Sequence, residues 1–259
     1  MEDPTIVQRH MKNTLRFQLI EPDKSLTDFV YSFSCLQNFS SQQEAVIIPN
    51  GKIDLIFSKT NDHQMVVALL GLETKPKYTN QEVVNFYSIS FNPLAIEYVF
   101  NESIADIINT GKILPTNFWD FSIEDLDNFE GFCKKATRKI KSLLPEKIDC
   151  RKHELFQLIF ASNGEISIKE VSEKLNWSER QINRYFSQQF GLPLKAYCKI
   201  LRFQYSLLHI KNGKLYPKLN FTDQSHFIKE IKQFSGVSPK ELHKNENDRF
   251  LQFLAYDED

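Results

Sequence analysis

The chain has 259 residues, of which 41% are hydrophobic and 25% are charged, as is usual for a soluble globular protein. At roughly 100 to 200 residues per domain, this length indicates two domains. The longest apolar run, Met65 to Leu72, is too short for a membrane span, which excludes a transmembrane protein, and we expect no membrane partner. The start, Met1 to Pro4, is acidic and lacks the apolar stretch of a secretory signal, so we expect a cytoplasmic protein.

The net charge of −1 hides an asymmetry along the chain. Residues 1–150 contain 15 basic and 20 acidic side chains, residues 151–244 contain 16 and 8, and the last fifteen residues return to −4. A surplus of eight positive charges in one block is typical of a protein that meets a polyanion, most often nucleic acid. Many lysine-rich faces are merely solvated, so the charge alone does not decide the partner.

Before about residue 100, the apolar residues form short β-branched or aromatic runs that predict strands. Asn50-Gly51 separates the first two runs and favours a tight hairpin turn, although Pro49 leaves the turn type open. Several short strands with turns between them indicate a β-sandwich or a small barrel. The predicted strands cover Ala45 to Ile48, Ile53 to Phe57, Met65 to Leu70 and Val83 to Phe91.

Helical patterns follow the strands. Short helices are expected at Leu94 to Phe100 and Ile104 to Ile108, and a longer one from Ser122 to Leu144 with Ser122 as its cap. A helix at about Lys152 to Ser162 should stop at Asn163-Gly164. The next long helix is predicted at about Pro193 to Lys211, and the side chains expected to face inward are Tyr197, Ile200, Leu201, Tyr205 and Leu208.

Two capping boxes stand eleven residues apart, between residues 166 and 190. Ser167 is followed three residues later by Glu170, and Ser178 by Gln181, so each pair can cap the start of a helix. The first helix then has Val171 and Leu175 on its apolar side, and the second has apolar residues at helical spacing as well. This spacing predicts a helix-turn-helix whose second helix is free to enter the major groove.

The outer face of the second helix is polar and carries two arginines one turn apart. Arginine can pair with guanine and glutamine with adenine, so this face is equipped to read bases. The alternative is an exposed polar helix that binds no DNA. The candidate DNA-contacting residues on this helix are Ser178, Arg180, Gln181, Asn183, Arg184, Ser187 and Gln188.

A second helical segment follows between Asn220 and Leu242. Thr222 is the expected cap of its helix, Gly236 ends the helix, and Ser238 to Glu241 forms a further capping box with Pro239 at its first helical position. The candidate DNA-contacting residues on this segment are Gln224, Ser225, His226, Lys229 and Lys232. For His226, packing against the helix or contact with phosphate is favoured over a pH-sensing role.

Residues 150 to 244 resemble the AraC family of bacterial transcription regulators. The resemblance rests on Ile168, Val171, Leu175, Ser178, Arg180, Arg184, Phe186, Gly191 and Pro193, and on Phe221, Asp223 to Phe227, Phe234, Gly236, Ser238 and Pro239. It implies two helix-turn-helix units joined by a long helix, which read successive major grooves roughly 34 Å apart. It also places Arg180, Gln181, Arg184 and Gln188 in the first reading helix, and Gln224, Ser225, His226 and Lys229 in the second.

The second unit departs from the family pattern. Between Gly213 and Phe221 the chain is about five residues shorter than that pattern, and Pro217 disfavours a helix through this stretch. The supporting helix of the second unit is therefore expected to be missing. The unit would then either grip phosphate without reading bases or serve only as a folding element.

The N-terminal part resembles the cupin-like sensory halves of such regulators, in Ile48 to Ile56 and in Phe91 to Pro93. We expect no cofactor and no metal, because residues 1–150 contain only two histidines and the four cysteines have no C-x-x-C spacing. The ligand of this part is unknown. Asp54 could contact one, but a charged residue on an outer face or at a hairpin is favoured.

These patterns predict an α+β fold with two domains: a cupin-like β-barrel or sandwich with short helices, and an all-α double helix-turn-helix. The boundaries are 1–120 for the sensory or dimerisation domain, 121–149 for a helical linker and 150–259 for the DNA-binding domain. The expected function is a sequence-specific double-stranded DNA-binding transcription regulator that is not an enzyme. Candidate partners besides DNA are RNA polymerase, a small-molecule effector and a second copy of the chain.

Two alternatives stay open. A regulator-like protein could act through protein contacts, with a second unit that no longer binds DNA. A cupin-type enzyme could be fused to a DNA-binding domain, and bound metal on the purified protein would support that alternative.

Overall fold

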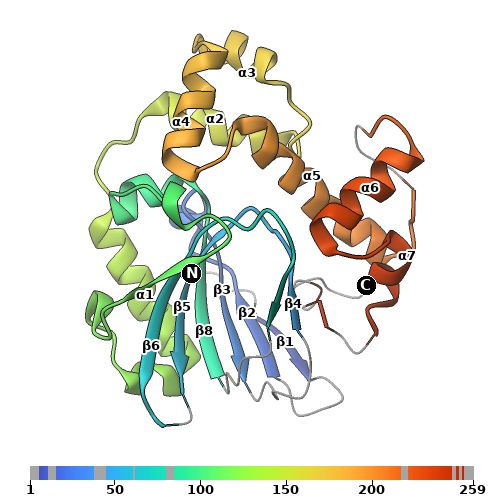
Figure 1. The fold of residues 1–259 in the computed structure, drawn as a ribbon. Coiled ribbons are helices and arrows are strands. Elements are labelled where there is room, and N and C mark those ends of the chain that lie inside the picture. Colours follow the sequence, from blue (N-terminus) through green and yellow to red (C-terminus); the bar gives the residue numbers. More distant parts are fainter. Residues whose placement is uncertain are drawn as a thin grey trace.

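The computed structural model describes residues 6–10, 16–37, 45–60, 62–79, 85–216, 221–246, 249–250 and 253. A sheet-rich N-terminal part precedes a helical C-terminal part, which confirms the α+β fold (Figure 1). The strands are β1 (Ile6–His10), β2 (Arg16–Ile20), β3 (Val30–Gln37), β4 (Ala45–Ile47), β5 (Ile53–Lys59), β6 (Met65–Leu70), β7 (Lys77–Thr79), β8 (Asn85–Phe91) and β9 (Gly111–Leu114).

The α-helices lie after the last strand. They are α1 (Phe129–Leu143), α2 (Cys150–Ala161), α3 (Ile168–Leu175), α4 (Glu179–Phe190), α5 (Leu194–Lys211), α6 (Gln224–Ser235) and α7 (Pro239–Lys244). Shorter turns are the 3₁₀ helices Lys24–Leu26, Ala105–Ile107, Phe118–Asp120 and Ile123–Asp127 and the π-helix Ile96–Phe100. No helix among the described residues is long and apolar enough to cross a membrane.

The strands form one seven-stranded sheet in the order β1-β2-β3-β8-β5-β6-β9 and a separate pair, β4-β7. Every pairing within these two sheets is antiparallel. In the part of the chain that the structure describes, no pairing joins β1 to β9. The large sheet therefore stays open there, so of the barrel or sandwich that was expected, no closed barrel is found among the described residues.

The hairpin predicted at Asn50-Gly51 is wrong. The turn exists, since Gly51 has φ of 72° and Asn50 Oδ1 accepts a hydrogen bond from the Lys52 amide at 2.8 Å. However, β4 pairs with β7, whereas β5 pairs with β6 and β8. Pro49 offers no amide to a ladder, and the chain uses this turn to pass from one sheet to the other.

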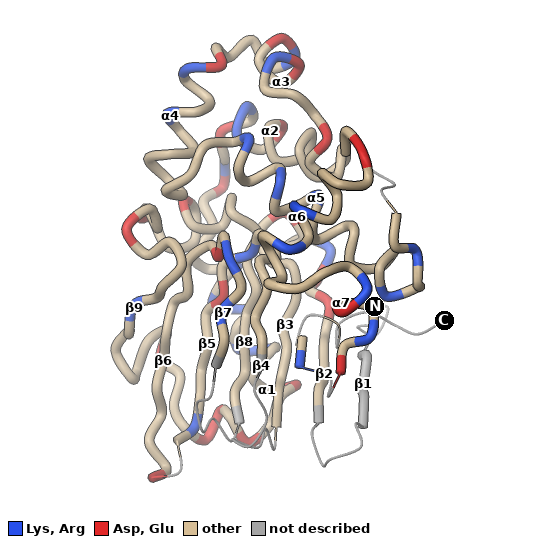
Figure 2. The backbone as a smooth tube through the Cα atoms, turned by 45° about the vertical axis from the view of Figure 1, so that its right-hand side comes forward, with Lys and Arg blue, Asp and Glu red and all other residues tan. Residues whose placement is uncertain are grey.

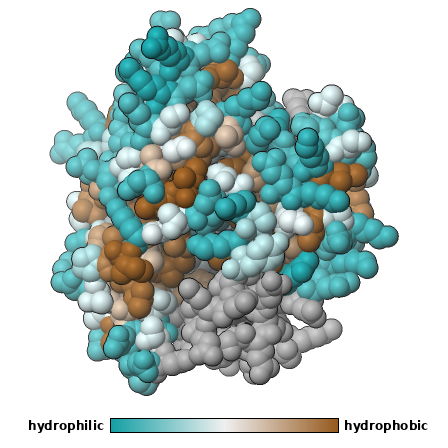
Figure 3. All heavy atoms as spheres, viewed as in Figure 1, coloured by the Kyte–Doolittle hydropathy of each residue, from teal (hydrophilic) through white to brown (hydrophobic). Residues whose placement is uncertain are grey.

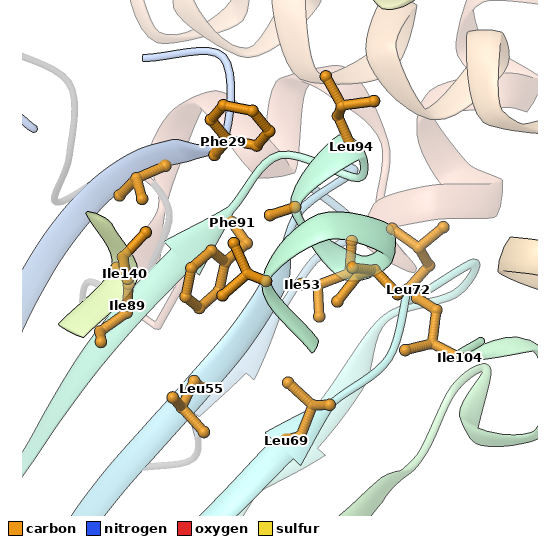
Figure 4. Packing of buried hydrophobic residues seen from close by; sticks show 14 of the residues in the cluster. Phe29, Ile53, Leu55, Leu69, Leu72, Ile89, Phe91, Leu94, Ile104 and Ile140 are labelled. Carbon is orange, nitrogen blue, oxygen red and sulfur yellow. The ribbon is translucent and has the colours of Figure 1, made fainter. Parts of the chain in front are cut away.

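Alternation along the central strands gives the large sheet two different faces. One face carries Ile53, Leu55, Phe57, Ile89 and Phe91, all buried in a hydrophobic cluster (Figure 4). Helix α1 packs on this cluster through Phe132, whose ring centroid lies 5.2 Å from that of Phe57. The expected helix from Ser122 to Leu144 is divided at Asn128, which caps α1 by accepting a hydrogen bond from the Gly131 amide.

Helix α5 connects two hydrophobic clusters. Its first turns, with Leu194 and Tyr197, belong to the cluster that also contains the large sheet and α1 to α4. Its later turns, with Phe203 and Leu207, belong to a second cluster with α6, α7 and Val46 of β4. The first cluster thus crosses residue 150, and the proposed domain boundaries stay a prediction.

Two side chains of α5 are placed differently from the sequence prediction. Tyr205 and Leu208, expected to face inward, are 42% and 41% exposed and line a cavity beside the sheet. An apolar residue on α5 does not by itself identify a core position, because the helix meets the sheet, α4, α6 and α7 on different sides. Tyr197, Ile200 and Leu201 are buried as predicted.

Candidate functional site

Both predicted capping boxes of the helix-turn-helix are present. Ser167 Oγ accepts a hydrogen bond from the Glu170 amide at 3.2 Å, and Ser178 Oγ accepts one from the Gln181 amide at 3.3 Å. Asn176, with φ of 51°, ends α3 in the left-handed conformation, so the chain turns at once into α4. The Gln181 side-chain oxygen accepts from the Ser178 amide and hydroxyl, which ties this predicted base reader to the cap.

One side of α4 fixes the helix in the protein. Ile182, Phe186 and Phe190 are fully buried. The Phe186 ring centroid lies 5.8 Å from that of Phe156 on α2 and 5.7 Å from that of Tyr197 on α5. These contacts hold α4 in one rotation about its axis, so its opposite face points outward.

The outward face of α4 carries most of the predicted DNA-contacting residues. Arg180, Arg184, Ser187 and Gln188 are exposed, while Asn183 is half-buried. Within the described residues, neither guanidinium group forms an ion pair. Figure 2 shows blue segments of the tube at α4, and Figure 3 shows a mostly hydrophilic surface over the top of the molecule, where α3 and α4 lie.

The carboxyl end of α4 is attached to the sheet-rich part of the chain. Ser103 Oγ donates a hydrogen bond to the Gln188 carbonyl at 2.7 Å, and the Ile104 amide donates to the Gln189 carbonyl at 3.0 Å. Near the middle of the helix, the Tyr185 hydroxyl donates to Glu97 Oε2 at 3.1 Å. These bonds hold one end of α4 and leave its first two turns, with both arginines, at the surface.

On α6, the second helix predicted to contact bases, several polar side chains bond to nearby residues of the same unit. Asp223, and not Thr222, caps this helix, because its carboxylate accepts a hydrogen bond from the His226 amide at 2.8 Å. The Gln224 amide group donates to the Leu215 carbonyl at 2.8 Å. Of the other predicted residues on α6, Ser225, Lys229 and Lys232 are exposed.

His226 is half-buried beside a carboxylate. Its Nε2 lies 3.6 Å from Glu230 Oε2, and Arg202 of α5 lies 3.3 Å from Glu230 Oε1. Glu230 is 2% exposed, so this pairing joins α6 to α5 inside the protein. His226 is therefore held beside Glu230 on its own helix, and its expected role in helix packing or in phosphate contact stays a prediction.

No helix lies between α5 and α6 in residues 212–216 and 221–223. The expected loss of the supporting helix concerns this stretch, and Pro217 itself lies outside the described residues. In the described residues of the second unit the helices are α6 and α7, and α5 contributes Phe203 to their shared cluster.

A cavity of about 430 Å³ lies between the second face of the large sheet and helix α5. Asp54 lines it together with Lys52, whose ammonium group donates a hydrogen bond to Asn92 Oδ1 at 2.7 Å. Burial lowers the pKa of Lys52 to about 8, and burial raises the pKa of Asp54. Asp54 was expected on an outer face or at a hairpin, but it lines this cavity, because the second face of the sheet is covered here by α5. Lys52 and the serines beside it were not predicted as site residues.

A signal for these serines exists in the sequence. Polar and buried apolar residues alternate in Ser32-Phe33-Ser34 and in Ser88-Ile89-Ser90. This alternation is typical of a strand with one polar face and one buried apolar face. Strand register then decides that the two pairs meet, and register cannot be read from either segment alone.

Among the described residues, no three His, Cys, Asp or Glu side chains gather in a group that could hold a metal ion. All four cysteines are free thiols.

Comparison with known proteins gives a family match for part of the chain. Residues 18–111 match a family described as Domain of unknown function (DUF6597). A search of curated proteins finds no match. The matched segment covers most strands of the large sheet and ends before the helical part.

Solved structures of ToxT from Vibrio cholerae are similar over most of the chain. The 1.65 Å structure has 12% identity and a TM-score of 0.43 and covers 89% of this chain and 97% of that chain. The unsaturated fatty acid-bound structure has 13% identity and a TM-score of 0.43, with coverages of 90% and 96%. Likeness at these values assigns no function to the present protein.

Proposed function

We propose that this protein is a transcription regulator of the AraC type that binds double-stranded DNA in a sequence-specific manner. In this proposal, α4 enters the major groove and reads bases through Arg180 and Arg184. The observation that carries it is that both arginines are exposed, and form no ion pair within the described part of the chain, on a helix whose other face is buried in the core. The resemblance of residues 150 to 244 to the AraC family supports the same function.

In the same proposal, the exposed lysines contribute the salt-dependent attraction to phosphate. The exposure of Lys229 and Lys232 on α6 supports this role for them, whereas Gln224 and His226 are held by bonds within the second unit. The second unit would thus grip the backbone more than it reads bases. The sheet-rich part would bind a small-molecule effector, with RNA polymerase and a second copy as further candidate partners.

Replacing Arg184 by Ala tests the base-reading role. Loss of one bidentate arginine–guanine pair should weaken binding to the preferred sequence by about 1 to 3 kcal/mol and relax specificity there. Non-specific binding should change much less. Arg138→Ala is the matched control, because Arg138 is an exposed arginine on α1. Equal losses on specific and non-specific duplexes in a binding titration would refute base reading by Arg184.

The second candidate is a protein that acts through protein contacts. Gln224 bonds to the Leu215 carbonyl and His226 pairs with Glu230, and these contacts within the protein favour a protein-contact role for the second unit. A salt titration of duplex binding separates the two functions. For a DNA-binding protein, the logarithm of the affinity falls linearly with the logarithm of the salt concentration. Duplex binding that is weak and nearly independent of salt would favour the second candidate.

A further inference from the structure

The cavity is built by both parts of the chain. Its floor is the face of the large sheet opposite to α1, and its other walls come from α5 and from the end of α2. Along α5 the lining residues are Leu201, Gln204, Tyr205, Leu208 and His209, which come from one side of the helix. A volume of about 430 Å³ is in the range of small-molecule pockets.

Most of the cavity wall is apolar. Phe17 lines it from β2, Leu36 from β3 and Phe86 from β8, and Ile56 and Leu70 line it from β5 and β6. Such a wall favours a ligand with an apolar, ring-containing or branched body.

The polar part of the floor is a strip of hydroxyl groups. Ser32 is paired in register with Ser90, and Ser34 with Ser88, so four hydroxyls face the cavity from two adjacent strands. Ser34 Oγ lies 2.6 Å from Ser88 Oγ, and Ser90 Oγ donates to Asp54 Oδ1 at 2.5 Å. A hydroxyl can donate or accept, so this strip can bond to a ligand group that does both.

A cation and an anion stand beside the serine strip. Lys52 and Asp54 both line the cavity from the start of β5. The Lys52 ammonium lies 4.4 Å from the ring centroid of Tyr31 and 5.0 Å from that of Phe160, in addition to its bond with Asn92. Its charge is therefore already stabilised by protein groups.

We propose that this cavity binds an uncharged small molecule that carries a hydroxyl group on an apolar body, such as a phenol or an alcohol. The hydroxyl lies on the serine strip, where it donates to Asp54 and accepts from a serine or from Lys52. The apolar body lies against Phe17, Leu36 and Phe86. This ligand class deepens the proposed regulator function, but the binding step itself does not depend on DNA.

Charged ligands are disfavoured by the same geometry. A carboxylate that pairs with Lys52 approaches Asp54, and an amine that pairs with Asp54 approaches Lys52. Because Lys52 and Asp54 are themselves partly buried on the cavity floor, the repulsive contact is screened less than it would be between fully exposed charges. An uncharged hydroxyl meets no like charge.

The test compares three probes with the same ring system near neutral pH: 2-naphthol, 2-naphthoate and 2-(aminomethyl)naphthalene. Calorimetric titration of the full chain, without DNA, should show 2-naphthol binding about tenfold or more tightly than either charged probe. Naphthoate or the amine binding as tightly as naphthol overturns the proposal. Failure of all three probes to bind a folded protein overturns it as well.

Two variants locate the site and the origin of the preference. Asp54→Asn removes the anion while an amide oxygen can still accept from Ser90, so affinity for 2-naphthoate should rise about tenfold relative to 2-naphthol. Leu208→Trp enlarges a side chain of the cavity wall and should abolish naphthol binding. Circular dichroism checks that both variants fold, and Asp127→Asn, an exposed carboxylate elsewhere, is the control.

Unchanged probe preference in folded Asp54→Asn, or naphthol binding that persists in folded Leu208→Trp, overturns the assignment to this cavity. Because these titrations contain no DNA, they can succeed when duplex binding fails and fail when it succeeds. The ligand inference and the proposed regulator function are thus tested separately.

Discussion

Replacing Tyr197 by Phe should weaken the contact between the sheet-rich part and α5. The Tyr197 ring is fully buried, and its hydroxyl donates a hydrogen bond at 3.0 Å to the carbonyl of Gly51, in the turn before β5. Phe keeps the ring but leaves this carbonyl without the bond. Leaving a buried acceptor unsatisfied costs about 1 to 3 kcal/mol, so the free energy of unfolding should fall by about that amount.

The assay uses the two tryptophans, which report on different regions. Trp119 stacks with Phe118 in the sheet-rich part, and Trp177 lies in the turn between α3 and α4. Urea unfolding is followed by fluorescence in Trp119→Phe and Trp177→Phe backgrounds, each with and without Tyr197→Phe. Because one hydrophobic cluster joins these regions, both probes should report the same loss.

The control for this experiment is Tyr216→Phe. Tyr216 is 57% exposed, so removal of its hydroxyl should change the free energy of unfolding by less than about 0.5 kcal/mol. If Tyr197→Phe has an effect as small as the control, the buried hydrogen bond does not stabilise the contact and the reasoning is refuted.

Further predictions concern the salt dependence of DNA binding, the fit of α4 against the sheet-rich part, and titration inside the cavity. Lys229→Ala should weaken duplex binding alike for all sequences and reduce the slope of log affinity against log salt by about 1; an unchanged slope would exclude a phosphate contact. Gly191→Ala should cost about 1 to 3 kcal/mol in thermal or urea unfolding, because Gly191 has φ of 76° and an added Cβ would lie 2.7 Å from the Ala105 carbonyl oxygen; wild-type stability would contradict this fit. Burial lowers the pKa of Lys52 to about 8 from 10.5, so between pH 8 and 10.5 the unfolded chain holds the Lys52 proton more often than the native protein does. The free energy of unfolding of the wild type should therefore rise with pH in this range, measured relative to that of Lys52→Met. Parallel pH profiles would mean that Lys52 is not buried. Of the four thiols, only the exposed Cys150 should react quickly with a thiol reagent in the native state, since burial raises the pKa of the other three to about 12; rapid reaction of more than one would contradict the packing.

The helix-turn-helix was predictable because its determinants are local. Ser167 with Glu170 and Ser178 with Gln181 fix where α3 and α4 begin, and these boxes depend on residues only three positions apart. Apolar spacing along α4 then predicts which face is buried. The outward position of Arg180 and Arg184 follows from the same periodicity.

The sheet was predictable only in part. The run from Met65 to Leu70 is strand β6 as predicted, but the pairing of β4 with β7 instead of β5 depends on contacts between distant segments. The cavity has the same origin, since Ser34 and Ser88 meet only through the register of β3 and β8. The exposure of Tyr205 also required knowledge of what faces α5.

The central claim is that the outward face of α4 reads a DNA sequence. Selection from a random pool of duplexes with the full wild-type chain, followed by the same selection with Arg184→Ala, tests it most directly. The wild type should enrich one common sequence motif, and the variant should lose preference at one or two adjacent base pairs within it. A wild-type pool that remains random, or a motif that is unchanged by the variant, would contradict the claim.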